Sequence, residues 1–303
     1  MWTTDGNGVV RRSEAPDAGR TDADIRQAVR RGELLVACRG LYIPRCSLPV
    51  EKWRLEQEVY KRRCLSEADA GAVLSHQSAA AVLGLAMLEP DMSRVHVSVQ
   101  TSANGKRRAT RHIHTSLDEN DVISLDGFLV TSPARSAVDV ALTSDFAGAL
   151  AVFDSALRIG VDRAELQDRL ESGRRRGIVR ARVALRYANG LAANPGESWS
   201  RAQMIEARLP VPSLQSEITV EGRTYFSDFD WDLLVIGEFD GQGKYLANLR
   251  PGEEVADAVL REKDRENALR RMGFEIVRWD WTVAKRRQVA ARVRPYLDAA
   301  GLL

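Results

Sequence analysis

Three carboxylates lie close together near the end of the chain, within two segments that otherwise look like buried β-strands. Asp228, Glu238 and Asp240 fall within thirteen residues, among aromatic and branched apolar side chains, and Gly241 follows them. Neighbouring carboxylates on one sheet face repel and raise one another's pKa unless a cation or a reacting group faces them. Mg²⁺, held by one or two carboxylates and completed by water and phosphate oxygens, would relieve that repulsion. The pattern therefore indicates metal-dependent phosphodiester chemistry, or a site descended from it.

Positive charge is concentrated elsewhere in the chain. The net charge is only +2, but acidic residues dominate segment 228–240, and basic residues cluster in segments 26–39, 106–111, 174–186 and 285–294. Such a distribution can place basic surfaces around one acidic pocket, as a phosphate-handling protein needs. The alternative is that the clusters are solvated helix faces, and both interpretations remain open.

The composition is that of an ordinary folded protein. The chain has 303 residues, 44% hydrophobic and 28% charged, which is enough for a sizeable core and two or three domains. It contains no run of 18 apolar residues and no apolar signal core at its start, so we expect neither membrane insertion nor export. The cysteines, Cys38, Cys46 and Cys64, have no CxxC spacing. That argues against a disulfide framework or a zinc knuckle and suits a reducing cytoplasm.

The first 48 residues predict a helix followed at once by a β-hairpin. Thr21 is the expected N-cap, acidic residues occupy the first turn, and Gly32 ends the helix. Segments 34–37 and 41–43 then read as strands around a turn at 38–40. This order is typical of a winged helix, in which the helix enters a DNA groove and the hairpin contacts the DNA backbone.

Four arginines are the predicted DNA-binding residues of this segment. Three lie on the exposed side of the helix or just after it and one at the hairpin tip: Arg26, Arg30, Arg31 and Arg39. The alternative is a generic helix–hairpin whose arginines only face water.

Short stretches of the first half resemble a known family. Arg31-Gly-Glu-Leu-Leu35 and Arg39-Gly-Leu-Tyr-Ile43 resemble the winged-helix domain of AbiEi-type antitoxins of abortive-infection systems. Ser75-His-Gln-Ser-Ala-Ala80 and Thr131-Ser-Pro-Ala-Arg135 resemble the region that follows that domain. The resemblance implies operator DNA and a cognate toxin protein as partners. Few residues precede the predicted helix, so we expect the first helix of a full winged helix to be short or missing.

Residues 50–190 are predicted to be mostly helical. Strand-like alternation occurs at 95–99, 111–114 and 128–131, and Ser132-Pro133 is a good N-cap and first position for a helix. Helical periodicity runs through 51–64, 75–86, 146–158, 163–171 and 176–189.

Two histidines share one face of a predicted strand in this region. His112 and His114 are two residues apart, which is the minimum geometry for a pair of metal ligands. No third ligand is nearby in the sequence, so exposed strand histidines are favoured over a zinc site.

The last third predicts an α/β domain with a mixed sheet. Asn194-Pro195-Gly196 marks a break, and we place a domain boundary just before it. The expected elements are a helix at 197–209, strands at 214–220, 223–230 and 233–240, a helix at 253–272, a strand at 274–278 and a helix at 283–298.

This element order and its motifs resemble the PD-(D/E)XK nuclease fold, most closely the group of very-short-patch repair endonucleases. The matching residues are Asp228, Trp231 and Glu238-Phe-Asp-Gly241, together with Arg278-Trp-Asp-Trp281. The resemblance implies that Asp228 and Glu238 ligate Mg²⁺ or Mn²⁺ and that Glu197 reaches the metal directly or through water.

The lysine of that family is not in its usual place. Asp240 occupies the position two residues after Glu238, where the family has its lysine. Lys244 is the nearby replacement, and we predict that it stabilises the attacking water or the transition state. A Lys244 ammonium within about 4 Å of the two acids would favour an enzyme. Other polar residues here have plainer interpretations. Asp230 and Asp232 suit a hairpin turn. Trp231, Trp279 and Trp281 suit the core more than a role in base stacking. Arg261, Lys263 and Arg265 could line a substrate groove, but alternating charge on a helix favours a solvated face.

The sequence thus predicts a multidomain α/β protein of the cytoplasm. Its parts are a winged helix (1–48), a mostly helical AbiEi-like middle domain (49–193) and a PD-(D/E)XK-like domain (194–303). The first functional hypothesis is a metal-dependent DNA endonuclease with Asp228, Glu238 and Lys244 as catalytic residues. The alternative is a non-catalytic AbiEi-type antitoxin or transcriptional regulator that binds operator DNA. DNA, a cognate toxin and a second copy of the chain are the expected partners, and no membrane is expected.

Overall fold

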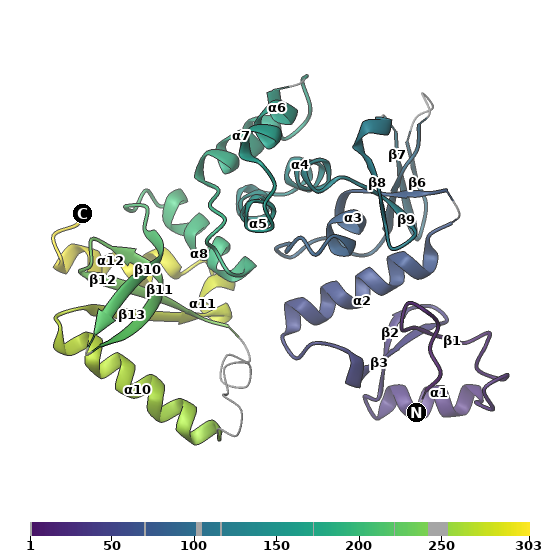
Figure 1. The fold of residues 1–303 in the computed structure, drawn as a ribbon, viewed down its shortest axis with the longest axis horizontal. Coiled ribbons are helices and arrows are strands. Elements are labelled where there is room, and N and C mark those ends of the chain that lie inside the picture. Colours follow the sequence, from purple (N-terminus) through teal and green to yellow (C-terminus); the bar gives the residue numbers. More distant parts are fainter. Residues whose placement is uncertain are drawn as a thin grey trace. The chain divides into compact units, whose positions relative to one another are not determined.

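The computed structural model describes residues 2–69, 71–100, 105–115, 117–171, 173–220, 222–241 and 254–303. They form two compact units, Met1–Val140 and Ala141–Leu303, each considered by itself (Figure 1). Helices and three sheets occur together, so the predicted α/β class is confirmed at that level. The predicted boundaries after residues 48 and 193 stay predictions. In the described part of the chain, no helix is both long and apolar enough to cross a membrane.

The first unit begins with a short strand, β1 (Val10–Arg11), and a well-capped helix, α1 (Asp22–Arg30). The Thr21 hydroxyl accepts a hydrogen bond from the backbone N–H of Asp24, and the Asp24 carboxylate accepts one from the N–H of Thr21 at 2.8 Å. These reciprocal bonds satisfy N–H groups that have no partner within the helix, and they lower the pKa of Asp24 from its ordinary value. The predicted N-cap and helix are confirmed.

The predicted hairpin follows directly. Strands β2 (Leu34–Cys38) and β3 (Leu41–Pro44) are antiparallel, and β1 pairs with the other edge of β3. Gly40 in the turn has a φ of +84°, a left-handed conformation that glycine adopts without a steric penalty. Among residues 2–21 the structure has no helix, as expected. The winged-helix assignment itself stays a prediction.

A short 3₁₀ turn, η1 (Arg45–Ser47), leads to α2 (Lys52–Glu67). The apolar side chains Leu55 and Val59 of α2 pack on a buried cluster that β3 and its flanks provide, formed by Val9, Leu41, Ile43 and Leu48. Removing these side chains from water is the main force that holds the N-terminal sheet against α2.

A six-stranded mixed sheet follows, although this region is predicted to be mostly helical. Its strands lie in the order β6-β7-β5-β4-β9-β8, with β5–β7 and β4–β9 parallel. The predicted strands at 95–99, 111–114 and 128–131 are confirmed, and three further strands were not predicted. The bounds are β4 (Val73–Leu74), β5 (Val95–Ser98), β6 (Lys106–Arg107), β7 (Arg111–His114), β8 (Val122–Leu125) and β9 (Phe128–Thr131). Three short helical elements accompany the sheet: α3 (His76–Val82), η2 (Glu119–Asp121) and α4 (Pro133–Thr143).

One buried serine fixes α3 against both α2 and the sheet. The Ser78 hydroxyl lies 2.7 Å from the Tyr60 hydroxyl and accepts the backbone N–H of His96 at 2.8 Å. The Tyr60 hydroxyl donates to the carbonyl of Arg94, also at 2.7 Å. Burial raises the pKa of Tyr60 far above its ordinary value, so the group stays a neutral phenol. This network sets the position of β5 relative to the start of α3.

The second unit opens with four helices close to those predicted: α5 (Phe146–Arg158), α6 (Arg163–Glu171), α7 (Ile178–Tyr187) and α8 (Pro195–Glu206). A buried ion pair joins α5 to α8, because an Arg201 guanidinium nitrogen lies 2.6 Å from the Asp154 carboxylate, which also accepts from the Ser198 hydroxyl. Helices on both sides of the predicted boundary at residue 193 therefore share one buried contact.

The chain then forms a four-stranded sheet in the order β10-β11-β12-β13. Its strands are β10 (Ser213–Val220), β11 (Arg223–Trp231), β12 (Val235–Asp240) and β13 (Glu275–Asp280). The first three are antiparallel, and β12 and β13 are parallel. The remaining helices are α10 (Val255–Arg271), α11 (Trp281–Lys285) and α12 (Val289–Ala299). The predicted order of elements in this region is confirmed, and the PD-(D/E)XK assignment stays a prediction.

Helix α10 lies along this sheet (Figure 1), and buried apolar side chains fill the contact. The cluster beneath α10 consists of Ile218, Val220, Ile236, Ala268, Leu269, Phe274 and Ile276. Aromatic residues of β11 and β13 form a second group, in which Trp279 donates to the Ser200 hydroxyl of α8 at 2.7 Å. Gly237 is required between them, because a Cβ there would lie 2.7 Å from the Trp279 ring.

Candidate functional site

The four predicted DNA-binding arginines all lie on the surface of the N-terminal segment. Arg26 and Arg30 are one helical turn apart on α1, Arg31 follows the helix, and Arg39 lies in the β2–β3 turn; all four are exposed. The other side of α1 buries Ile25 and Ala28. The helix is therefore amphipathic, with a cationic outer face.

Neighbouring acids neutralise this surface only in part. Arg31 lies 3.9 Å from Glu33, and Asp22 at the start of α1 pairs with Arg12. The hydrogen bond from Arg12 lowers the pKa of Asp22. Within the described ranges, the other three arginines form no ion pair. Guanidinium groups presented in this way can contact phosphate oxygens, which fixes a protein on DNA without reading its sequence.

The structure also brings together two of the predicted catalytic acids. The β11–β12 register pairs Phe229 with Gly237, so Asp228 and Glu238 occupy the next facing positions. Regular pairing stops there, because the Asp228 carboxylate accepts the backbone N–H of Phe239 at 2.8 Å. Asp228 therefore lies where the regular hydrogen-bonded pairing of β11 and β12 ends, facing the buried Glu238.

Two arginines face the Glu238 carboxylate. Glu238 is only 2% exposed, and it pairs with Arg265 of α10 and with Arg278 of β13, the latter at 3.0 Å. The prediction that Arg265 lies on a solvated helix face is wrong, since its side chain reaches inward to this buried acid. A buried carboxylate needs such partners, because leaving the charge unpaired away from water is costly.

The third predicted metal ligand, Glu197, forms hydrogen bonds at the start of its own helix, α8. Glu197 is buried near the start of α8, where its carboxylate accepts the backbone N–H of Ala193 at 2.7 Å and the Asn194 amide at 2.6 Å. Asn194 in turn caps α8, and Pro195 occupies the first position of the helix. The Asn-Pro-Gly stretch predicted as a break is thus a helix start.

As arranged, these acids do not fit a magnesium ion. Mg²⁺ demands a near-octahedral set of oxygens, whereas Glu238 faces two guanidinium groups and Glu197 is bonded to its own helix start. Within the described ranges, no three carboxylates converge closely enough to share an ion. Lys244 lies outside the described residues. The catalytic and metal-binding roles of Asp228, Glu238, Glu197 and Lys244 therefore stay predictions.

The neighbouring aspartates and tryptophans have the structural roles expected of them. Asp230 accepts the N–H of Leu233 at 2.9 Å within the β11–β12 turn, where Asp232 has a positive φ. Trp231 and Trp279 are buried, whereas Trp281 is only partly buried and packs against Phe239. Trp231 and Trp279 therefore expose no ring face on which a nucleic-acid base could stack.

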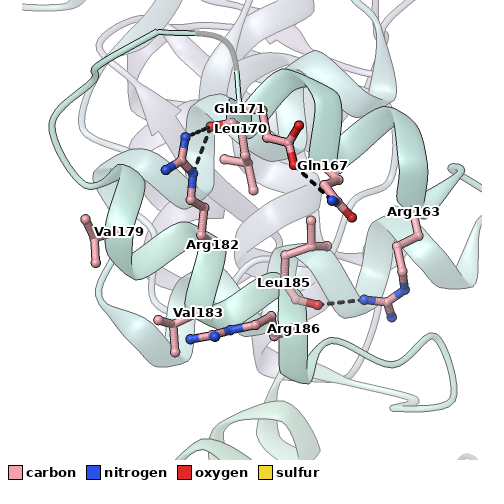
Figure 2. Close-up of a pocket in the computed structure, with 9 residues that line it drawn as sticks. All are labelled: Arg163, Gln167, Leu170, Glu171, Val179, Arg182, Val183, Leu185 and Arg186. Atoms are coloured by element: carbon pink, nitrogen blue, oxygen red, sulfur yellow. Dashed lines mark hydrogen bonds between the residues drawn. The ribbon is translucent and has the colours of Figure 1, made fainter.

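A hollow of about 750 Å³ lies between α6 and α7 (Figure 2). Arginines dominate its polar lining, but two of them bond to helix ends. Arg163 donates to the carbonyls of Leu185 and Ala188 at the end of α7, and Arg182 donates to that of Leu170 in the last turn of α6. Cationic side chains at helix C-termini satisfy free carbonyls and complement the helix dipole. We therefore regard the hollow as a helix junction and assign it no ligand.

Two uncharacterized proteins of Mycobacterium tuberculosis, from strains CDC 1551 / Oshkosh and ATCC 25618 / H37Rv, are each 35% identical to the chain over 182 residues. Each match covers 58% of this chain and 64% of the relative, so slightly less than two thirds of either relative is spanned. Residues 70–187 match the family profile described as AbiEi antitoxin C-terminal domain. In the sequence, this match begins just before β4, the first strand of the six-stranded sheet, and ends at the last residue of α7. In this central region, the chain is thus similar to AbiEi antitoxins.

Proposed function

We propose that this protein is a DNA-binding regulator of the AbiEi antitoxin type, with a toxin protein as partner. The observation that carries the proposal is the family match of residues 70–187. In the sequence, this match follows an exposed cationic helix and hairpin, with α2 between them. An antitoxin that regulates its own expression needs a DNA-contacting surface and a separate region for its partner. The arginine surface of α1 and the β2–β3 turn supplies the first.

The physical basis of DNA binding is electrostatic. Each arginine that neutralises a phosphate releases condensed counterions, so the logarithm of affinity falls with the logarithm of salt concentration by nearly one unit per contact. Arg30 and Arg39 lie on different elements, the helix and the hairpin turn. Two independent contacts of this kind would orient the segment on the duplex.

We expect Arg30→Ala and Arg39→Ala each to weaken binding to DNA from the protein's own promoter region. Fluorescence anisotropy at several salt concentrations should give a log–log slope that falls by about one unit per lost contact. Arg180→Ala is the matched control, because Arg180 is an exposed arginine on α7 in the second unit. If both N-terminal variants keep the wild-type affinity and slope, the proposed surface does not bind DNA.

A metal-dependent endonuclease is the second candidate. One observation favours it, namely that Asp228 and Glu238 occupy facing positions at the opened end of the β11–β12 ladder. Against it stand the two arginines on Glu238, which supply the positive charge that an ion would otherwise provide. We therefore rank DNA binding without cleavage first.

A further inference from the structure

All four histidines of the chain gather at one place in the first unit. The sequence contains four histidines, and they come from three elements: His96 from β5, His112 and His114 from β7, and His76 from the start of α3. The parallel register sets His96 beside His112, and His114 follows on the same strand face. Strand pairing and the start of α3 thus assemble a cluster of four histidines, of which sequence spacing indicated only the His112–His114 pair.

The ring nitrogens of three of these residues lie within reach of a single ion. One ligand atom each from His76, His96 and His114 can be chosen so that all lie within 4.8 Å of one another. His96 Nδ1 and His114 Nε2 are 3.0 Å apart. Two nitrogens bound tetrahedrally to Zn²⁺ at 2.0–2.1 Å are about 3.3 Å apart, so this pair already has nearly the separation required.

The rings are packed closely even without an ion. Those of His76 and His114 are stacked, with centroids 3.6 Å apart and planes inclined by 15°. A shared ion needs the lone pairs of these rings to converge, so the stacked rings must turn about their side-chain bonds when the ion binds. The backbone of His76 is already unusual, since its φ is +50°, in a region that residues other than glycine seldom occupy. Such strain concentrates at functional sites.

The surroundings keep the imidazoles neutral, which is the form that binds metals. Burial, together with the neighbouring histidines, lowers the pKa of His114 to about 3, and burial lowers the pKa of His96 to about 4. Burial also holds the pKa of His76 well below its ordinary value. Arg135 is among the charged groups that disfavour protonation of His76 and His114. Each neutral ring keeps one lone pair near neutral pH. Because His96 Nδ1 and His114 Nε2 share a hydrogen bond, one of these two nitrogens must lose its proton, by a change of tautomer, before both can bind an ion.

Polar groups behind the rings suit a metal centre. Nδ1 of His76 lies 3.2 Å from the Ser75 hydroxyl and 3.8 Å from the Asp139 carboxylate. A carboxylate behind a ligating histidine fixes the ring and increases its basicity. Ser98, the register partner of His114, is 2% exposed, and its hydroxyl has no hydrogen-bond partner within the described ranges. A buried hydroxyl without a partner is costly, and a water on a bound ion would relieve that cost.

We propose that His76, His96 and His114 form a binding site for one divalent transition-metal ion, with Zn²⁺ as the expected occupant. Three neutral nitrogen donors favour zinc over Mg²⁺ or Ca²⁺, which prefer oxygen ligands. Three protein ligands leave a fourth tetrahedral position for water or for an added ligand. The ion would tie the start of α3 to strands β5 and β7. The site is independent of the proposed DNA-binding surface and of the acids in the second unit.

The test uses the full chain, purified without a histidine tag and stripped of metal with a chelator. Isothermal titration with Zn²⁺ should show one tight equivalent, and Co²⁺ should give the visible absorption of a tetrahedral nitrogen site. A bound ion stabilises only the folded state, so saturating Zn²⁺ should raise the unfolding temperature of the wild type. We expect His96→Gln and His114→Gln to weaken Zn²⁺ binding by more than about tenfold.

Two further variants keep the outcome decisive. Cys38→Ser with Cys46→Ser removes the two thiols that are not fully buried and should leave Zn²⁺ binding unchanged. Circular dichroism of the metal-free histidine variants will show whether they fold. Ser98→Ala, which alters no ligand but removes the hydroxyl placed beside the water on the ion, should lessen the zinc-dependent rise in unfolding temperature without abolishing it. The proposal is overturned if the wild type binds no Zn²⁺, or if its binding survives both histidine substitutions or disappears with the two thiols.

Discussion

Glu238 is held between two guanidinium groups while only 2% of its surface is exposed. Two explanations of this residue predict opposite effects of removing its charge. If Glu238 and Asp228 were mutually repelling metal ligands, a neutral side chain would relieve the repulsion and stabilise the metal-free protein. If the acid is a structural counterion, the same change leaves two arginines without their partner.

We therefore expect Glu238→Gln to lower the free energy of unfolding by roughly 3 kcal/mol, as for other broken buried ion pairs. Chemical denaturation followed by tryptophan fluorescence, without divalent metal, will measure it, because Trp231 and Trp279 are buried in the same sheet. Glu275→Gln is the control, since Glu275 is exposed on the adjacent strand and should change little. A more stable Glu238→Gln protein would favour the metal-site interpretation instead.

For individual residues, the sequence indicated which ones are unusual but not which side chains they contact. The spacing of Asp228 and Glu238 predicted two facing strands, and the register agrees with that. It could not show that Arg265 and Arg278 reach Glu238, because those residues lie on α10 and β13 and meet it only after the sheet has formed. For the same reason, inspecting the nearby sequence could not show that His76 and His96 join His114.

Among the secondary-structure elements, α1 depends most clearly on a local signal. The reciprocal Thr21–Asp24 bonds close its first turn, and nothing beyond four neighbouring residues is needed to predict them. We expect Thr21→Ala to cost about 1 kcal/mol in the stability of the N-terminal segment. Hydrogen exchange of the α1 amides should speed up, whereas that of α12 amides should not.

The same cap should respond to pH in a defined direction. The pKa of Asp24 is lowered in the folded state, mainly by its backbone hydrogen bond to Thr21. The stabilisation is therefore complete above the ordinary aspartate pKa and is lost as the pH falls through the lower folded-state value. Asp24→Asn removes the charge, so its α1 amides should exchange faster than those of wild type at neutral pH, and the difference should shrink as the pH falls below the ordinary aspartate pKa. A difference that does not change with pH would contradict this assignment.

Element prediction succeeded where a segment carries its own signal. Long helices such as α5 and α10 and the strands of the last sheet show clear periodicity or dense β-branched and aromatic residues. The two-residue strands β4 and β6 have no room for alternation, and they exist only because neighbouring strands pair with them. That is why the middle region is expected to be mostly helical and yet contains a six-stranded sheet.

For the whole molecule, charge segregation matters more than net charge. The total is only +2, but exposed arginines lie on α1 and in the β2–β3 turn, while Asp228 and Glu238 are bonded internally. Charges that are bonded internally contribute little to long-range attraction, whereas exposed ones steer a polyanion. The exposed arginines of α1 and the β2–β3 turn, and not the acidic segment 228–240, should therefore determine how the protein binds DNA.

We expect the full chain to bind promoter-region DNA in buffer without Mg²⁺ or Mn²⁺ and to leave it intact when either ion is added. Arginine–phosphate contacts need no metal, and a carboxylate already paired with two guanidinium groups is a poor ligand for Mg²⁺. Gel-shift assays will measure binding, and supercoiled plasmid incubated with each ion will reveal any nick. Asp228→Asn and Glu238→Gln are tested beside the wild type to exclude a contaminating nuclease. Metal-dependent nicking by the wild type that both variants lose would establish the enzyme instead.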